Sequence, residues 1–109
     1  MTNQAIQESI RKMAQSIVKQ FDPQMVVLFG SHARDEGGPD SDIDLLVVMP
    51  VKTSRRQVAI EIERALIDRQ LPLDLIVVTP EEIQRDRERV DFVAAAALRE
   101  GKILYERAA

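Results

Sequence analysis

Three aspartates are the residues best placed to do chemistry, and two of them, Asp44 and Asp74, lie inside predicted strands, where this residue type is disfavoured. Asp42 and Asp44 lie in the segment SDIDL, and Asp74 lies in the segment LDLIVV. Side chains alternate across a strand, so Asp42 and Asp44 project from the same face. If Asp74 faces the same way from a neighbouring strand, the carboxylates converge, and a divalent cation is the simplest means of keeping them ionised. Oxygen ligands favour Mg²⁺ or Mn²⁺. The alternative is that these acids lie at strand ends, solvated or capping loops.

A glycine-serine pair follows the first predicted strand directly. Gly30 permits a sharp turn and a close approach of the backbone to a ligand. Ser31 can N-cap a short helix through Ala33 and Arg34, whose first N–H groups would attract an anion. Such a pair alone is often only a turn. Just upstream of the paired aspartates, it predicts a phosphate cradle beside a metal site, which is the chemistry of nucleoside triphosphates.

The hydrophobic pattern predicts the elements that position these residues. Spacings of three and four indicate helices, and continuous apolar runs bounded by glycine or proline indicate strands buried on both faces. The order of the elements predicts one α/β domain over residues 1–109. Helices are predicted from Ile6 to Phe21, from Ser54 to about Arg69 and over 81–100 with a break near Arg89, and strands over 25–29, 43–49, 73–78 and 102–105.

The last predicted helix carries an apolar stripe that should face the core. Its members are Val90, Val93, Ala94, Ala97 and Leu98.

The composition excludes several classes of protein. The chain has 109 residues, 45% hydrophobic and 30% charged, as expected of a soluble globular protein. The absence of cysteine excludes a disulfide scaffold, and the single histidine excludes a multi-histidine zinc site within one chain. A net charge of -3 with 4% aromatic residues gives no surface for nucleic acid. No apolar run approaches the roughly 20 residues that span a bilayer, and no signal peptide is visible, so we expect a cytoplasmic protein that does not contact membranes.

These motifs together resemble a known superfamily. The segment GSHAR at 30–34, the segment SDIDL at 41–45 and Asp74 are similar to the nucleotidyltransferases with a DNA polymerase β-like palm, above all to their minimal nucleotidyltransferase (MNT) branch. The resemblance covers nearly the whole chain. It implies an α+β fold, in which helices flank a small mixed β-sheet.

The resemblance also implies roles for individual residues. Asp42 and Asp44 would bind two Mg²⁺ ions, with Mn²⁺ as a substitute, and Asp74 would be the third ligand and help to activate the attacking hydroxyl. Gly30 and Ser31 would hold the β- and γ-phosphates of ATP. Arg34 would contact phosphate or a carboxylate, unless it only packs its stem or forms a surface ion pair.

The branch also implies a partner. MNT proteins are typically paired with a helical HEPN toxin, so the chain would be an antitoxin that transfers AMP from ATP to a tyrosine of that toxin. Two alternatives stay open, namely neutralisation of the partner by binding alone and transfer to a small molecule. The acceptor can also lie on a second copy of the chain in a homo-oligomer.

Two residues of the first loop need separate interpretation. His32 occupies the variable position of the GSxAR motif, which favours a surface role or a place at the edge of the substrate over catalysis. Many relatives have glycine after the motif arginine, whereas this chain has Asp35 and delays its glycines to Gly37 and Gly38. A different bend of the loop is therefore expected between Arg34 and Ser41.

Overall fold

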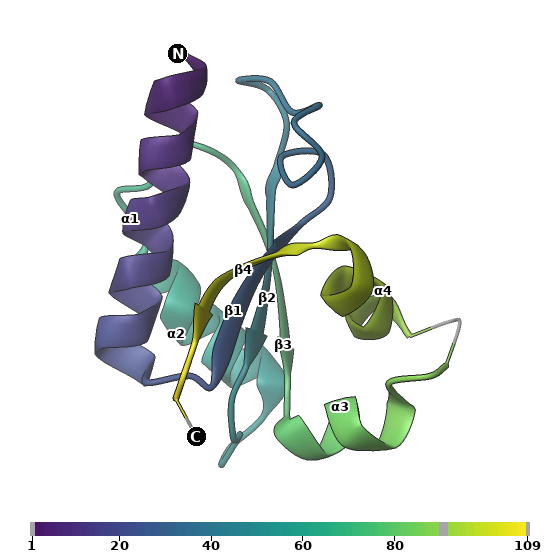
Figure 1. Cartoon of the computed structure of the whole chain (residues 1–109). Helices are drawn as coiled ribbons and strands as arrows, with labels where there is room; N and C mark the ends of the chain where they lie inside the picture. The colour runs from purple at the N-terminus through teal and green to yellow at the C-terminus, as the bar shows by residue number, and fades with distance from the viewer. Residues whose placement is uncertain (1, 90–91, 109) are drawn as a thin grey trace.

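The computed structural model describes residues 2–89 and 92–108, and these residues form four helices and four strands (Figure 1). The element order agrees with the order predicted from the sequence. In chain order the elements are α1 (Asn3–Phe21), β1 (Met25–Phe29), β2 (Ile43–Val48), α2 (Arg55–Ala65), β3 (Leu73–Val78), α3 (Pro80–Asp86), α4 (Val93–Glu100) and β4 (Lys102–Glu106).

The strands form a single mixed sheet in the order β3-β2-β1-β4. β1 is antiparallel to both β2 and β4, while β2 and β3 are parallel. The parallel pair needs a crossover connection, and α2 supplies it. The predicted mixed sheet is therefore confirmed, and the two strands that carry the aspartates are neighbours.

The helices cover the sheet on both faces, with α1 and α2 on one side and α3 and α4 on the other (Figure 1). Alternate residues of β1 divide between them: Val26 and Leu28 pack in the α1/α2 core, and Val27 packs in the α4 core. The central strands β1 and β2 are therefore buried on both faces, as their apolar runs predict. β3 lies at the edge, so its first half is only partly covered and the prediction of full burial is wrong for it.

The ends of α1 and α2 follow from local capping. Thr2 caps α1 by accepting a hydrogen bond from the N–H of Ala5, so the helix starts before the first apolar residue of the pattern. α2 ends at Ala65, earlier than predicted. Arg69 lies in the following turn, where its guanidinium donates to the carbonyls of Glu63 and Leu66 at 3.3 and 3.1 Å. A cation at this helix end is favoured by the exposed carbonyls.

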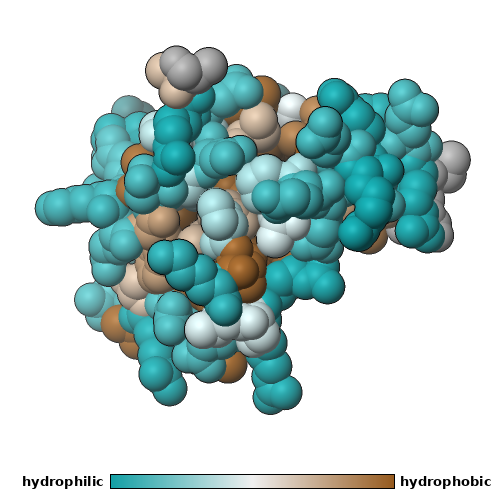
Figure 2. Space-filling model, turned by 90° about the horizontal axis from the view of Figure 1, so that it is seen from below, coloured by the Kyte–Doolittle hydropathy of each residue, from teal (hydrophilic) through white to brown (hydrophobic). Residues whose placement is uncertain are grey.

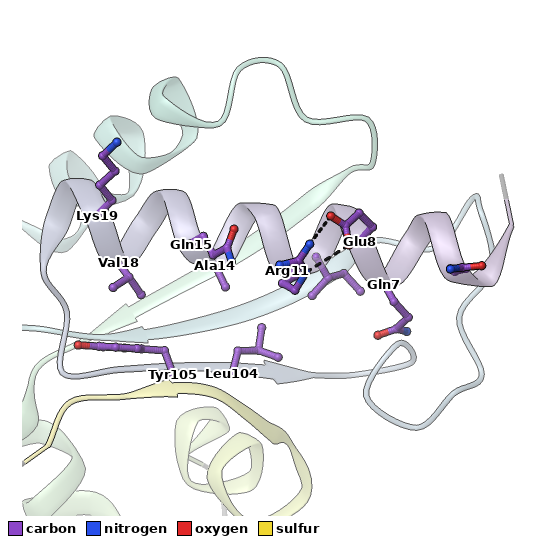
Figure 3. A pocket seen from close by; sticks show the side chains of 11 residues that line it. Gln7, Glu8, Arg11, Ala14, Gln15, Val18, Lys19, Leu104 and Tyr105 are labelled. Atoms are coloured by element: carbon purple, nitrogen blue, oxygen red, sulfur yellow. Dashed lines mark hydrogen bonds and ion pairs between the residues drawn. The ribbon is translucent and has the colours of Figure 1, made fainter.

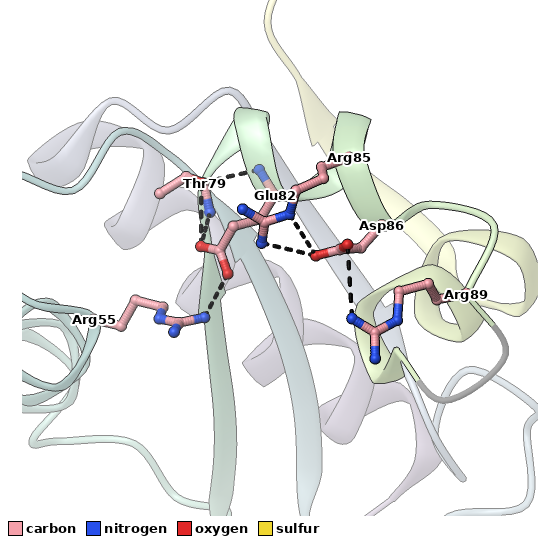
Figure 4. Close-up of polar contacts among 6 residues, drawn as sticks. All are labelled: Arg55, Thr79, Glu82, Arg85, Asp86 and Arg89. Atoms are coloured by element: carbon pink, nitrogen blue, oxygen red, sulfur yellow. Dashed lines mark hydrogen bonds and ion pairs between the residues drawn. The ribbon is translucent and has the colours of Figure 1, made fainter.

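The predicted helix over 81–100 is two helices, α3 and α4, which confirms the break near Arg89. Asp86 is buried at the end of α3 and forms ion pairs with Arg85 at 2.8 Å and Arg89 at 3.8 Å (Figure 4). Of the predicted apolar stripe, Ala94, Ala97 and Leu98 pack against the sheet, whereas Val93 is 56% exposed. Val90 lies outside the described residues.

The surface at the end of the sheet opposite the 30–42 loop is largely hydrophilic, with a small apolar patch (Figure 2). Among residues 2–89 and 92–108, the helices are too short or too polar to cross a bilayer.

The capping box of α3 generates a first prediction. The hydroxyl of Thr79 accepts from the N–H of Glu82 at 3.1 Å, and the Glu82 carboxylate accepts from the N–H of Thr79 at 3.1 Å. Thr79→Ala should lower the free energy of unfolding by about 1 kcal/mol, since it leaves the first-turn donors unpaired. Urea denaturation measures the change. The matched variant Thr53→Ala, at an exposed position before α2, should change it by less than about 0.5 kcal/mol, and equal losses would contradict the capping role.

Candidate active site

Strand register brings two of the predicted carboxylates together. Asp44 of β2 lies opposite Phe29 of β1 and beside Asp74 of β3. Paired residues on neighbouring strands project from the same face of a sheet. Leu46 and Ile76, two positions further along each strand, pack in the α4 core. Asp44 and Asp74 therefore point to the face that α3 and α4 cover, at the end of the sheet where β1 stops.

Asp42 lies just before β2 and is exposed. The alternation of side chains along β2 does not extend to it, but its charge acts on the Asp44 carboxyl. Within residues 2–89 and 92–108, no group of three or more His, Asp and Glu side chains is arranged to hold a metal ion. Asp44 and Asp74 thus converge as predicted. Asp42 lies near them but does not complete a set of three metal ligands.

The pKa of Asp44 is raised above the usual value for an aspartate. Partial burial is the largest cause, because desolvation disfavours the charged form. The negative charges of Asp74 and Asp42 raise the pKa further, His32 opposes them, and a hydrogen bond between the carboxyls of Asp44 and Asp74 favours the protonated form. Adjacent carboxylate oxygens under this repulsion have the chemistry that a hard divalent cation requires.

Gly30 ends β1 in a conformation that other residues rarely adopt. Its φ is +73°, in the left-handed region. A Cβ at this position would overlap the Asp44 side chain, with Oδ2 as the nearest atom. The absence of a side chain is therefore required both by the backbone and by space. As a result, the predicted phosphate-binding turn lies directly against Asp44, the member of the carboxylate pair on β2.

The segment after β1 forms consecutive turns, so the short helix predicted there is wrong. The Gly30 carbonyl accepts from the N–H of Ala33 at 3.1 Å, and the Ser31 carbonyl accepts from the N–H of Glu36 at 2.9 Å. Within the described part of the chain, the backbone N–H groups of Ser31 and His32 meet no protein acceptor. The donors available to an anion are therefore those of a turn.

Asp35 explains why no helix forms. Its φ of +60° lies in the left-handed region, which interrupts a right-handed helical run. Glycine suits this conformation best, and aspartate is among the few other residues that tolerate it. Aspartate therefore adopts a positive φ here without glycine's freedom. Lys102 forms an ion pair with Asp35 at 3.6 Å.

His32 is buried, with 2% of its surface exposed, so the expected surface or substrate-edge position is wrong. Its Nε2 lies 3.2 Å from the carbonyl oxygen of Ser41, and Gly37 packs against the ring. The pattern around the GSxAR motif did not indicate this arrangement. The available signal was Gly37, whose lack of a side chain leaves room for the ring beneath the loop.

Arg34 forms a surface ion pair, which was one of the alternatives for it. Its Nε donates to Glu36 Oε2 at 3.2 Å. Arg34 also lines a small cavity of about 130 Å³ together with Phe29, Gly30 and Glu100. The guanidinium is therefore beside the candidate site but paired with a carboxylate.

Comparison with known proteins identifies the fold. Residues 10–104 match the family described as Nucleotidyltransferase domain. The chain belongs to this family. The fold is similar to that of a Sulfolobus solfataricus protein described as a nucleotidyltransferase, with a TM-score of 0.65 and 19% identity over 96% of this chain and 84% of that one. No curated protein sequence matches the chain.

Two further structures of similar fold come from toxin–antitoxin complexes. One is a toxin–antitoxin with AMP-PNP, with a TM-score of 0.57 and 19% identity over 89% of this chain and 73% of that one. The other is a tri-AMPylated Shewanella oneidensis HEPN toxin in complex with an MNT antitoxin, with a TM-score of 0.50 and 21% identity over 97% and 74%. These likenesses establish the α/β nucleotidyltransferase fold.

A larger groove of about 610 Å³ lies elsewhere on this nucleotidyltransferase domain, between α1 and β4 (Figure 3). Ala14, Val18, Leu104 and Tyr105 provide its apolar part. None of the predicted site residues lines it. The size of a groove is therefore a poor guide to the chemistry of this domain.

The left-handed conformation of Asp35 generates the second prediction. Asp35→Ala should lower the free energy of unfolding by about 1 kcal/mol, because alanine is strained where φ is positive. Asp35→Asn and Asp35→Gly should stay close to wild type, since both tolerate this region. Thermal unfolding of the set measures the effect. Asp35→Asn also removes the ion pair with Lys102, so a loss as large as that of alanine would attribute the effect to charge rather than to backbone strain.

The raised pKa of Asp44 generates the third prediction. The folded chain binds a proton on Asp44 at higher pH than the unfolded chain does, so stability from this group falls as the pH rises from the unfolded to the folded pKa. Without divalent cations, Asp44→Asn should therefore be more stable than wild type at pH 7. The gain should shrink as the pH approaches about 4, where the unfolded carboxyl also binds its proton.

Free energies of unfolding across this pH range measure the effect. Asp68→Asn, at an exposed position after α2, is the matched control and should stay within about 0.5 kcal/mol of wild type throughout. A destabilised Asp44→Asn at pH 7 would contradict the assignment of repulsion to the carboxylate pair.

Proposed function

We propose that this chain is a single minimal nucleotidyltransferase domain, and that it transfers AMP from ATP to a tyrosine of a HEPN toxin as that toxin's antitoxin. The observation that carries the proposal is the Asp44–Asp74 pair, which strand register brings together and whose Asp44 lies against the backbone of Gly30. Family membership supplies the class of chemistry, nucleotidyl transfer. ATP and Mg²⁺ are both available in the cytoplasm, where we expect the protein to act.

The carboxylates would hold Mg²⁺. Asp44 and Asp74 offer adjacent oxygens, and Asp42, exposed just before β2, would supply the third donor. When bound, the ion neutralises charge on the phosphate oxygens during displacement. The unpartnered N–H groups of Ser31 and His32 would hold phosphate oxygens in the turn after Gly30.

The transfer would proceed by displacement at the α-phosphorus of ATP. The tyrosine oxygen forms a bond to that phosphorus, while the bond from it to the oxygen bridging the α- and β-phosphates breaks. Pyrophosphate leaves with the electron pair of that bond, and Asp74, the exposed member of the pair, accepts the phenolic proton. The protein contributes mostly positioning and charge neutralisation, which a small site supplies.

Two of the similar folds support the choice of partner and donor. One belongs to a complex of a tri-AMPylated HEPN toxin with an MNT antitoxin, and the other to a toxin–antitoxin that holds AMP-PNP. A second candidate function is neutralisation by binding alone. The observation that favours it is that Asp42, Asp44 and Asp74 do not close a metal site among the described residues.

Labelled ATP separates the two functions. Incubation of the chain with ATP labelled at the α-phosphate, Mg²⁺ and its partner HEPN toxin should place label on the toxin. Asp42→Asn, Asp44→Asn and Asp74→Asn should each lower the rate at least about 100-fold, and chelation of Mg²⁺ should abolish it. Intact-mass spectrometry of the toxin reports the number of AMP groups.

Asp68→Asn serves as the control and should transfer label at the wild-type rate. If the toxin gains no mass and the three aspartate variants still neutralise it, binding alone is the function. Release of pyrophosphate only with small-molecule acceptors would instead assign a small-molecule substrate.

A further inference from the structure

His32 is a buried polar side chain for which the proposed chemistry has no direct use. It is 2% exposed, and its Nε2 lies 3.2 Å from the Ser41 carbonyl oxygen. A carbonyl oxygen only accepts, so Nε2 carries the proton and donates. An apolar side chain would fill the same space without the cost of burying an imidazole. The hydrogen bond to Ser41 is therefore a property of histidine that an apolar side chain could not supply.

The loop that follows is wrapped around the imidazole. A Cβ on Gly37 would lie 2.5 to 2.7 Å from Nδ1, Cε1 and Cγ of His32, so the Gly37 backbone rests on the ring and leaves no room for a side chain. The loop then closes on itself, because the Ser41 N–H donates to the Gly38 carbonyl at 3.1 Å and the Gly38 N–H donates to Ser41 Oγ at 3.2 Å. Ser41 is thus fixed from two sides, by the ring and by the turn.

The hydrogen bond between His32 and Ser41 joins two segments of the proposed site. His32 follows Ser31 in the proposed phosphate turn, and Ser41 precedes Asp42, the exposed carboxylate outside the hydrogen-bonded part of β2. The ladder of the sheet fixes Asp44 and Asp74. Asp42 lies outside that ladder, between Ile43, whose N–H donates to the Pro72 carbonyl at 2.8 Å, and Ser41, so the hydrogen bonds of Ser41 fix the chain on its other side.

We infer that His32 is a positioning residue that fastens Ser41, and through it Asp42, to the phosphate turn. The inference rests on the proposed function, because it assigns Asp42 to the cation and the turn to the phosphates. It implies that cation affinity depends on a side chain that touches neither cation nor nucleotide.

The test replaces the ring with side chains that keep or remove its donor. The Gln amide nitrogen reaches about as far as Nε2, so His32→Gln should retain the bond to Ser41, whereas His32→Leu fills the space without a donor. Mn²⁺ binding in the presence of AMP-PNP, measured by electron paramagnetic resonance, should weaken about 10-fold in His32→Leu and stay near wild type in His32→Gln. Hydrogen exchange over residues 37–42 should be faster in His32→Leu and unchanged in His32→Gln.

Ile62→Val controls for loss of stability alone, since it trims a fully buried side chain of α2 away from the loop. It should leave both Mn²⁺ affinity and exchange over 37–42 unchanged. Equal Mn²⁺ affinity in wild type and His32→Leu, or an equal loss in His32→Leu and His32→Gln, would overturn the inference and leave the proposed function standing. Failure of the wild type to bind Mn²⁺ with AMP-PNP would overturn the proposed function, and the exchange rates would then still decide whether His32 fastens the loop.

Discussion

The forced proximity of Asp44 and Asp74 is the constraint on which the rest of the site depends. Neighbouring strands lie about 4.8 Å apart. Two carboxylates at that distance repel by roughly 3 kcal/mol at an effective dielectric near 20, an upper limit here because Asp74 is exposed to solvent. Ile43 and Leu45 flank Asp44 and are fully buried on the opposite face, in the α1/α2 core. Apolar packing on one face therefore holds the charge in place on the other.

Among the described residues, neither Asp44 nor Asp74 forms an ion pair with a basic side chain. Stability and activity then oppose each other, since a neutral residue at position 44 would relieve the repulsion but remove the oxygen donor. The turn after β1 has the complementary deficiency: Ser31 and His32 present N–H groups without protein acceptors, within the described residues, beside the carboxylates. A phosphate with its cation, as in the proposed function, would supply what both halves lack. The geometry thus suits a pair of ligands that carry opposite charges.

Close packing of α4 and of Gly101 against β1 holds the sheet that carries the site. α4 packs on its face of the sheet through small residues, among them Ala94 and Ala97, so that the helix lies close to β1. Gly101 continues this close approach, because a Cβ there would come within 2.5 Å of the Leu28 carbonyl oxygen. The buried cores on both faces make the sheet a rigid frame, and the candidate site residues lie at one end of it, on β2, on β3 and in the turn after β1.

Local pattern in the sequence was sufficient for the order of the elements and for the turn at Gly30. The hydrophobic periodicity of a segment and the preference of glycine for tight turns depend on residues close in the chain. Both can therefore be predicted without knowledge of the tertiary structure. The pairing of Asp44 with Asp74 needed the parallel register of β2 and β3, which is set by contacts between residues distant in the chain. The edge position of β3 likewise follows from strand order, and its apolar run alone resembled a buried strand.

The burial of His32 was decided only by tertiary structure, for a related reason. A lone histidine in a polar loop is ordinarily exposed, because burial of its ring costs free energy unless a partner is present. That partner is a backbone carbonyl at Ser41, brought back by the turn at Gly38, and every residue type has such a carbonyl. Side-chain chemistry was therefore determined by the sequence, whereas the backbone groups that complete it were selected by the path of the folded chain.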